Sequence, residues 1–139
     1  MPAAAGHSGT PLARKLGIRA GHILLLADAP EGFTIPGLPD GLLVQRRPDR
    51  AAPFDTALWF PADRADLTAR LVELRAAMRP AAGLWIAWPR RASGVPTDLT
   101  EDVLREVALP TGLVDTKVCA VDGTYSGLRF VVRRELRTA

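Results

Sequence analysis

The chain has one cysteine and no long apolar run, and each absence excludes a class of protein. With Cys119 alone among 139 residues, we expect neither an internal disulfide nor a cysteine-based metal site. The longest apolar runs, residues 23–27 and 81–88, are far shorter than the roughly 20 residues that cross a bilayer. We therefore predict neither a membrane-spanning protein nor a membrane partner.

Patterns that would indicate a particular chemistry are also missing. The sequence contains no phosphate-binding glycine loop, no cluster of metal ligands and no convincing pair of carboxylates. Its N-terminus lacks the basic segment followed by an apolar one that marks a signal peptide. We predict a cytoplasmic protein without a metal or a cofactor.

The residues that are present fit one globular domain. Hydrophobic residues make up 47% of the chain and charged residues 24%, which is enough to build a single core. The formal charge of +3 favours anionic partners weakly and does not by itself indicate nucleic-acid binding. We expect a disordered tail over residues 1–10 and a single α/β domain over residues 11–139; the oligomeric state stays open.

Apolar runs bounded by turn residues predict six strands, and two longer helices lie between them. Leucines recur at helical spacing between Leu67 and Met78, so we expect a helix capped by Asp63 and stopped by Pro80. A short helix is also expected over residues 12–16. The strands are expected over residues 22–27, 42–46, 54–60, 83–88, 113–121 and 128–133.

A second long helix is expected to follow the fourth strand. Asp98 and Glu101 have the spacing of a capping box, which predicts that Asp98 begins this helix. Pro110 and Gly112 are expected to end it.

The alternation of strands and helices favours a mostly parallel sheet with right-handed crossovers. The last two strands have no helix between them, so one strand must be antiparallel. This layout resembles the later half of class I methyltransferases. We predict a three-layer α/β fold, a reduced Rossmann-like sheet with strand order 2-1-3-4-6-5.

Short motifs spread over nearly the whole chain carry a second resemblance. They are Lys15-Leu16-Gly17-Ile18, Gly32-Phe33, Trp88-Pro89, Ser93-Gly94 and the segments 97–101, 112–115, 117–120 and 126–128. On these motifs the chain resembles the DUF3052 family of small bacterial proteins. That family has no established activity, so the resemblance implies a bacterial protein but no function.

The loop after the fourth strand is the predicted binding site. Ligands of open parallel sheets collect beyond the carboxyl ends of the strands. The guanidiniums of Arg90 and Arg91, the hydroxyl of Ser93 and the amides near Leu99 and Thr100 would converge there on an anion. The alternative is a solvated basic loop whose side-chain acceptors only cap the next helix.

Four further residues are candidates to line a pocket, namely Asp28, Trp88, Tyr125 and Ser126. No paired base accompanies Ser126, so we interpret it as a turn residue rather than a nucleophile. Cys119 lies in an apolar strand and is expected to be a buried, inert thiol. Catalytic residues stay unassigned.

The sequence departs from a methyltransferase where the cofactor would bind. The turn after the first strand, residues 27–33, has one glycine, and Pro30 removes an N–H from it. The second strand ends in Arg46 and Arg47, where an acid would hold the ribose hydroxyls. Both departures weaken the expectation of S-adenosylmethionine binding.

Three functions compete at this point. The leading hypothesis is a non-catalytic or regulatory module that binds a protein partner or a small anionic ligand at the strand-end loops. The first alternative is a degenerate methyltransferase-like enzyme. The second is weak nucleic-acid binding, which depends only on the arginine-rich C-terminus, with Arg133, Arg134 and Arg137.

Overall fold

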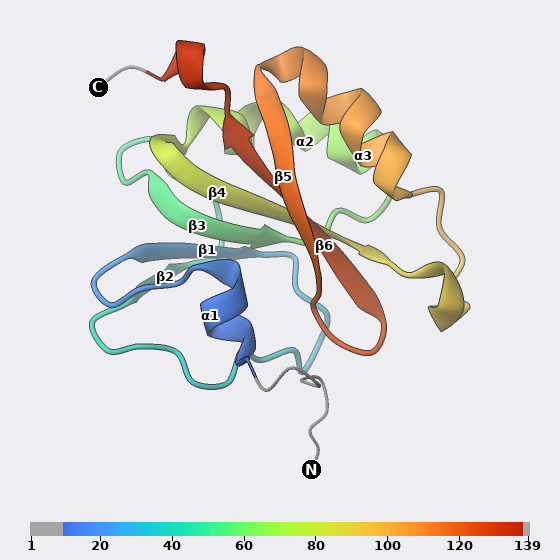
Figure 1. The fold of residues 1–139 in the computed structure, drawn as a ribbon, viewed down its shortest axis with the longest axis horizontal. Coiled ribbons are helices and arrows are strands. Elements are labelled where there is room, and N and C mark those ends of the chain that lie inside the picture. Colours follow the sequence, from blue (N-terminus) through green and yellow to red (C-terminus); the bar gives the residue numbers. More distant parts are fainter. Residues whose placement is uncertain (1–9, 138–139) are drawn as a thin grey trace.

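The computed structural model describes residues 10–137 and shows a six-stranded sheet between two layers of helix (Figure 1). The tail expected over residues 1–10 lies outside the described residues, apart from Thr10. The strand order β2-β1-β3-β4-β6-β5 confirms the prediction, and β6 runs antiparallel to both of its neighbours. The strands are β1 Ile23–Ala27, β2 Leu43–Gln45, β3 Phe54–Trp59, β4 Met78–Pro89, β5 Leu113–Ala120 and β6 Tyr125–Val132.

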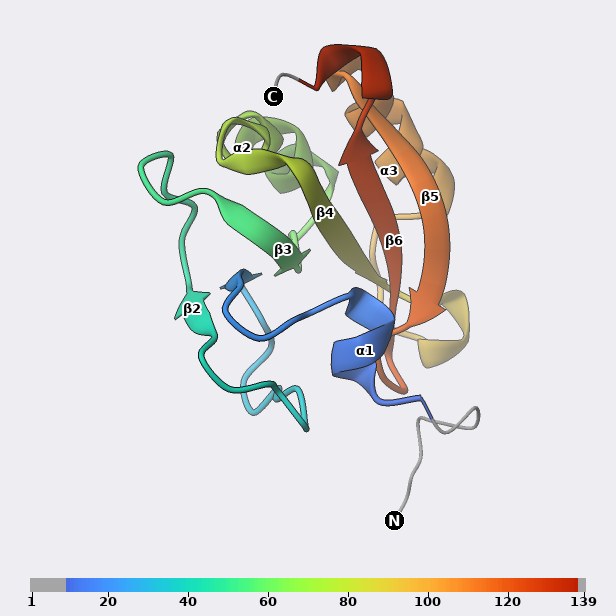
Figure 2. The ribbon, with the colours of Figure 1, turned by 60° about the vertical axis from the view of Figure 1, so that its left-hand side comes forward.

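Helices cover both faces of the sheet unequally, as Figures 1 and 2 show. The helices α2 (Arg64–Ala76) and α3 (Glu101–Ala108) pack on one face, and the short α1 (Leu12–Leu16) packs on the other. This confirms the three-layer α/β fold. No helix within residues 10–137 has the length and apolar character needed to cross a membrane.

The core consists of two apolar clusters, one on each face of the sheet. Along β1, Leu25 faces the α2 and α3 cluster while Leu24 and Leu26 face α1, because successive side chains of a strand alternate. Burial on both faces is typical of a central parallel strand. Each fully buried leucine stabilises the fold by about 1.5–3 kcal/mol. On the thinner side, the indole Nε1 of Trp85 donates to the carbonyl of Leu16 at 3.0 Å and so fixes α1 to the sheet.

The start of α2 confirms the sequence analysis, but its end corrects it. The Asp63 carboxylate accepts from the amide of Asp66 at 2.8 Å, as an N-cap does. The helix ends at Ala76, however, and Pro80 lies inside β4 instead of stopping the helix. The strand tolerates this proline because the pairing of β3 with β4 is interrupted between Met78 and Gly83. No neighbouring strand therefore needs a backbone N–H at position 80.

The start of α3 also differs from the prediction. Thr100, not Asp98, is the N-cap, and its hydroxyl accepts from the amide of Val103 at 3.1 Å. Asp98 instead accepts from the amide of Arg64 at 2.9 Å, at the first residue of α2. Both residues carry a side-chain acceptor, and the packing of the two helices decides which amide each one meets. Beyond α3, a single 3₁₀ turn leads to Gly112, whose φ of 93° ends the helical segment.

The hairpin between β5 and β6 is tighter than the sequence predicted. The strand β6 begins at Tyr125, three residues earlier than expected. One carboxylate oxygen of Asp122 accepts from the amides of Thr124 and Tyr125, each at 2.8 Å. This side chain satisfies two amides of the turn, which lets the chain reverse within a few residues.

Candidate functional site

The parallel strands β1, β2 and β3 all end at the same edge of the sheet. The chain runs from the central β1 outward to β2 and then returns to β3 on the opposite side of β1. This reversal is a topological switch point, where the loops diverge and leave a crevice beyond the strand ends. The registers pair Leu25 with Gln45 and Ala27 with Trp59, so the three strand ends lie side by side.

A cleft of about 760 Å³ occupies this crevice above β1 and β2. Its walls are the turn after β1, the loop after β2 with Arg46 and Arg47, and the helix α2 with Arg70 and Glu73. Its volume lies within the roughly 300–1,000 Å³ of small-molecule sites. We call it the basic lobe.

A second hollow of about 650 Å³ lies above β3 and β4. We call it the apolar lobe, because most of its wall is apolar. Asp28, Pro30 and Arg70 line both hollows, so the two lobes adjoin. The apolar residues of the wall include Phe60, Pro61, Pro89, Val95, Pro96 and the ring of Tyr125.

Asp28 stands at the boundary between the lobes. Its Oδ2 accepts from the indole Nε1 of Trp59 at 3.2 Å and from Arg70 at 2.5 Å. Its φ of 58° makes it the one described non-glycine residue in the left-handed region, where aspartate is tolerated better than most residues. Strain of this kind costs on the order of 1–3 kcal/mol and concentrates at functional sites.

The charge of Arg70 is compensated within the chain. Partial burial lowers its pKa, but the hydrogen bond and charge of Asp28 outweigh this and raise the pKa overall. Asp66 lies 3.6 Å away as a second carboxylate, and the guanidinium carbon is 5.9 Å from the centre of the Trp59 ring. Arg70 therefore stays charged and holds the wall of the cleft.

Arg46 and Arg47 differ from Arg70 in having no ion pair within the described part of the chain. Both are exposed, and both line the basic lobe. The resemblance to methyltransferases implies an acid where this pair stands, but the sequence did not show that the two arginines face a cleft. The useful signal was their position directly after a strand that neighbours β1.

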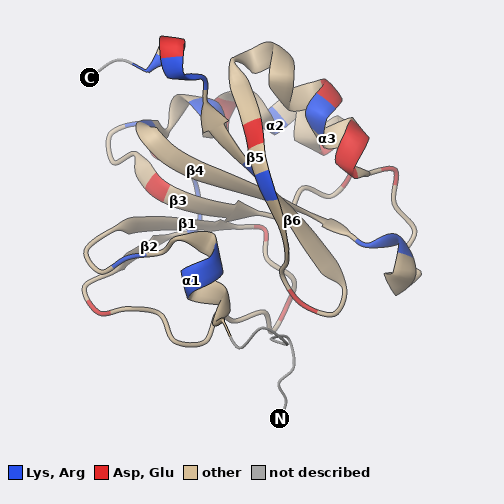
Figure 3. Ribbon diagram, viewed as in Figure 1, with Lys and Arg blue, Asp and Glu red and all other residues tan. Residues whose placement is uncertain are grey.

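Three further arginines, Arg64, Arg79 and Arg105, form ion pairs within the described chain. On α3, where Figure 3 shows acidic and basic residues side by side, Arg105 contacts Glu101, Asp102 and Asp115. The hydrogen bonds that Arg105 donates to the carboxylates of Asp115 and Glu101 raise the pKa of Arg105. Among the described residues, no group of three or more potential ligand side chains could hold a metal ion.

Most polar groups of the predicted strand-four loop form hydrogen bonds with other residues of the chain. Arg90 donates from Nη2 to the carbonyl of Gly123 at 2.9 Å, and the hydroxyl of Ser93 donates to the carbonyl of Arg90 at 2.6 Å. The amide of the buried Leu99 is bound to the hydroxyl of Thr97 at 3.0 Å, and Thr100 caps α3.

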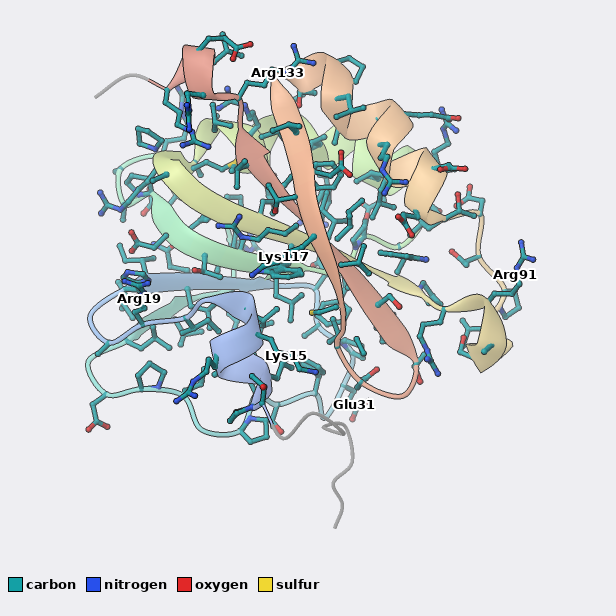
Figure 4. All side chains as sticks on the ribbon, in the orientation of Figure 1. Lys15, Arg19, Glu31, Arg91, Lys117 and Arg133 are labelled. Atoms are coloured by element: carbon teal, nitrogen blue, oxygen red, sulfur yellow. The ribbon has the colours of Figure 1, made fainter. Side chains whose placement is uncertain are left out.

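Arg91 is the exception in this loop. Its guanidinium forms no hydrogen bond or ion pair with any residue in the range 10–137, and Figure 4 shows it pointing away from the body of the protein. Anion binding at this loop stays a prediction, although neither lobe includes Arg90 or Arg91 in its wall.

The remaining candidates separate into two groups. Asp28 and Tyr125 lie on the wall of the cleft, whereas Trp88 belongs to the core and Ser126 pairs within the sheet between β4 and β5. Cys119 is half-buried and not fully buried as expected; this partial burial raises the pKa of its thiol, although the charges of nearby lysines oppose the shift. This is the direction expected for an inert thiol.

Comparison with known proteins identifies the fold but no family. No protein-family model and no curated protein matches the chain. The solved structure of LepI in complex with SAM matches over 96% of this chain and 49% of its own, with a TM-score of 0.52 and 15% identity. A structure described as a pericyclic reaction enzyme matches over 96% of this chain and 50% of its own, with a TM-score of 0.53 and 14% identity.

A variant of LepI, C52A, in complex with SAH and a substrate analogue, matches over 92% of this chain and 40% of its own, with a TM-score of 0.51 and 18% identity. The chain shares with these structures a three-layer α/β fold with a mostly parallel sheet. The chain spans half or less of the length of these structures, and identities this low carry the fold alone.

Proposed function

We propose that this chain is a ligand-binding domain that takes a small anion in the basic lobe. The observation that carries the proposal is the pair Arg46 and Arg47, two exposed guanidiniums without an ion pair in the described chain, on the wall of a cleft of about 760 Å³. Guanidiniums bind phosphate and carboxylate groups through parallel hydrogen bonds. The cleft lies at the carboxyl ends of parallel strands, where such sheets hold their ligands.

The methyltransferase-like fold implies S-adenosylmethionine as an alternative ligand, and the residues present do not fit it. Pro30 removes a backbone donor from the turn after β1, and the Asp28 carboxylate is already engaged with Trp59 and Arg70. Two cations stand where an acid would hold the ribose, and they would repel the positive sulfonium. No methyl-transfer step follows from this site.

The likeness to LepI bound to SAM supports a second candidate, a degenerate methyltransferase-like enzyme. A binding assay with S-adenosylmethionine and phosphate compounds separates the two candidates. Tight binding of S-adenosylmethionine, with no response to phosphate compounds, would favour the enzyme. Membership of the DUF3052 family and a protein partner both stay predictions.

The test is a thermal-shift screen, followed by calorimetry, with inorganic phosphate, pyrophosphate, AMP and S-adenosylmethionine as probes. We expect at least one phosphate compound to raise the melting temperature, since a ligand at 100 times its Kd stabilises the native state by about 2.7 kcal/mol. No shift with any phosphate compound would overturn the proposal.

The location of the site is tested with two double variants. Arg46→Ala with Arg47→Ala should weaken binding of the phosphate probe at least tenfold. Arg90→Ala with Arg91→Ala is the matched control and should bind within twofold of the parent. The opposite result would move the site to the strand-four loop. Circular dichroism shows whether each variant is folded.

A further inference from the structure

The two lobes adjoin across the ends of β2, β1, β3 and β4. Asp28, Pro30 and Arg70 belong to both walls, and the ion pair between Asp28 and Arg70 lies at their boundary. A row of aromatic rings follows the same course. Phe33 lines the basic lobe and lies 5.1 Å from Phe60, whose ring is 5.1 Å from that of Tyr125 in the apolar lobe.

The lobes differ in what they can bind. The basic lobe has unpaired positive charge at Arg46 and Arg47. The apolar lobe has flat proline and tyrosine surfaces and Val95, whose exposed fraction is 44%. A group that covers this surface removes apolar area from water, which favours binding by roughly 25 cal/mol per Å².

The boundary between the lobes also has a free acceptor. Asp28 uses Oδ2 for both of its hydrogen bonds, and Oδ1 has no partner among residues 10–137. A carboxylate oxygen accepts readily from a hydroxyl group. The hydroxyl of Thr97 accepts from the amide of Leu99, so its own hydrogen remains available to an acceptor in the apolar lobe.

We propose that the ligand is a nucleoside phosphate that spans both lobes, an inference that rests on the proposed function. Its phosphate binds Arg46 and Arg47, a sugar hydroxyl donates to Asp28 Oδ1, and the base lies against Tyr125 and the prolines of the apolar lobe. The arrangement requires a ligand that is anionic at one end, hydroxylated in the middle and flat and uncharged at the other.

The experiment is isothermal calorimetry with four probes that differ by one part each. Inorganic phosphate has the anion alone, ribose 5-phosphate adds the sugar, AMP adds the base, and adenosine lacks the phosphate. We expect affinity to rise from phosphate to ribose 5-phosphate to AMP, with AMP at least tenfold tighter than ribose 5-phosphate. Adenosine should bind more weakly than AMP.

Variants test the apolar lobe. Tyr125→Ala should reduce the ratio of AMP affinity to ribose 5-phosphate affinity by about tenfold and leave phosphate binding unchanged. Because Tyr125 also packs on Phe60, the exposed Val95 provides a second variant, and Val95→Ser should lower the same ratio by about threefold. The matched control is Val118→Ser on β5, 48% exposed and outside both lobes, which should leave the ratio unchanged.

The outcomes separate the two proposals. If AMP binds no tighter than ribose 5-phosphate while the Arg46 and Arg47 double variant loses both, the nucleoside assignment is overturned and the anion site stands. An affinity ratio that neither lobe variant changes would also overturn the assignment. If no phosphate compound binds the parent protein, both proposals fail.

Discussion

Two arginine pairs follow strand ends in this protein, and the structure treats them differently. Arg46 and Arg47 line an open cleft without an ion pair in the described chain. Arg90 is bound to the carbonyl of Gly123, and Arg91 points outward. A basic pair after a strand therefore does not by itself predict a cleft, because a cleft also needs walls that face the pair.

The antiparallel strand explains the difference. The end of β4 lies beside β6, and the turn between β5 and β6 folds against it, with the amide of Arg90 donating to Thr124 at 2.8 Å. At β1 the chain leaves toward β2, and the next strand, β3, lies on the opposite side of β1, which makes this edge a switch point. The hairpin turn thus holds Arg90 outside the apolar lobe, whereas Arg46 and Arg47 line the basic lobe at the switch point.

The largest expected effect comes from breaking the wall of the cleft. Asp28→Ala should destabilise the protein by about 2–3 kcal/mol, because the buried indole N–H of Trp59 loses its acceptor. The exposed pair with Arg70 contributes little to this sum. Asp28→Gly removes the same bonds but accepts the positive φ, so it should be about 1 kcal/mol more stable than Asp28→Ala. Urea unfolding measures both, and equal midpoints would show that the backbone there is unstrained.

The corresponding change on the hairpin side is Asp122→Ala. It should cost about 1–2 kcal/mol, since two turn amides lose their acceptor. Asp122→Asn keeps an oxygen in place and is the matched control, expected within about 0.5 kcal/mol of the parent. Phosphate binding at Arg46 and Arg47 should be unchanged in both. A loss of binding would show that the two regions are coupled.

A smaller effect is expected from the two side chains that accept hydrogen bonds at the starts of α2 and α3, Asp98 and Thr100. Asp98→Ala and Thr100→Ala should each cost about 1 kcal/mol through loss of a side-chain acceptor at a helix start. Amide hydrogen exchange distinguishes them. Asp98→Ala should speed exchange at Arg64 in α2, and Thr100→Ala should speed it at Val103 in α3. Faster exchange at Val103 in the Asp98 variant would contradict the structure.

The smallest effect concerns the stability of the two arginine pairs themselves. Arg46→Ala with Arg47→Ala should change the free energy of unfolding by less than about 0.5 kcal/mol, because exposed charges contribute little. Arg90→Ala with Arg91→Ala should cost somewhat more, about 0.5–1.5 kcal/mol, through the lost hydrogen bond to Gly123. Chemical denaturation of both double variants measures the two losses of unfolding free energy. A larger loss for the Arg46 and Arg47 variant would contradict the proposed difference between the two pairs.

The sequence by itself determined the order and type of the elements. Apolar runs such as residues 23–27 and the spacing of Leu67, Leu71 and Leu74 are local patterns, so each predicts its strand or helix from neighbouring residues alone. The strand order was predicted from the resemblance of this layout, with its closing pair of strands, to the later half of class I methyltransferases. The cap at Asp63 was equally local, because its partner lies three residues away.

Only the tertiary structure decided which distant groups meet. Asp98 accepts a hydrogen bond from the first residue of α2, 34 residues earlier in the chain. Pro80 is tolerated in β4 because β3 does not pair with β4 at that position. The different surroundings of the two arginine pairs depend on a hairpin turn, because Arg90 bonds to Gly123, 33 residues away, and Arg46 and Arg47 do not contact this turn. Local patterns act over a few residues, whereas a cleft is made by loops whose proximity arises only after the sheet has formed.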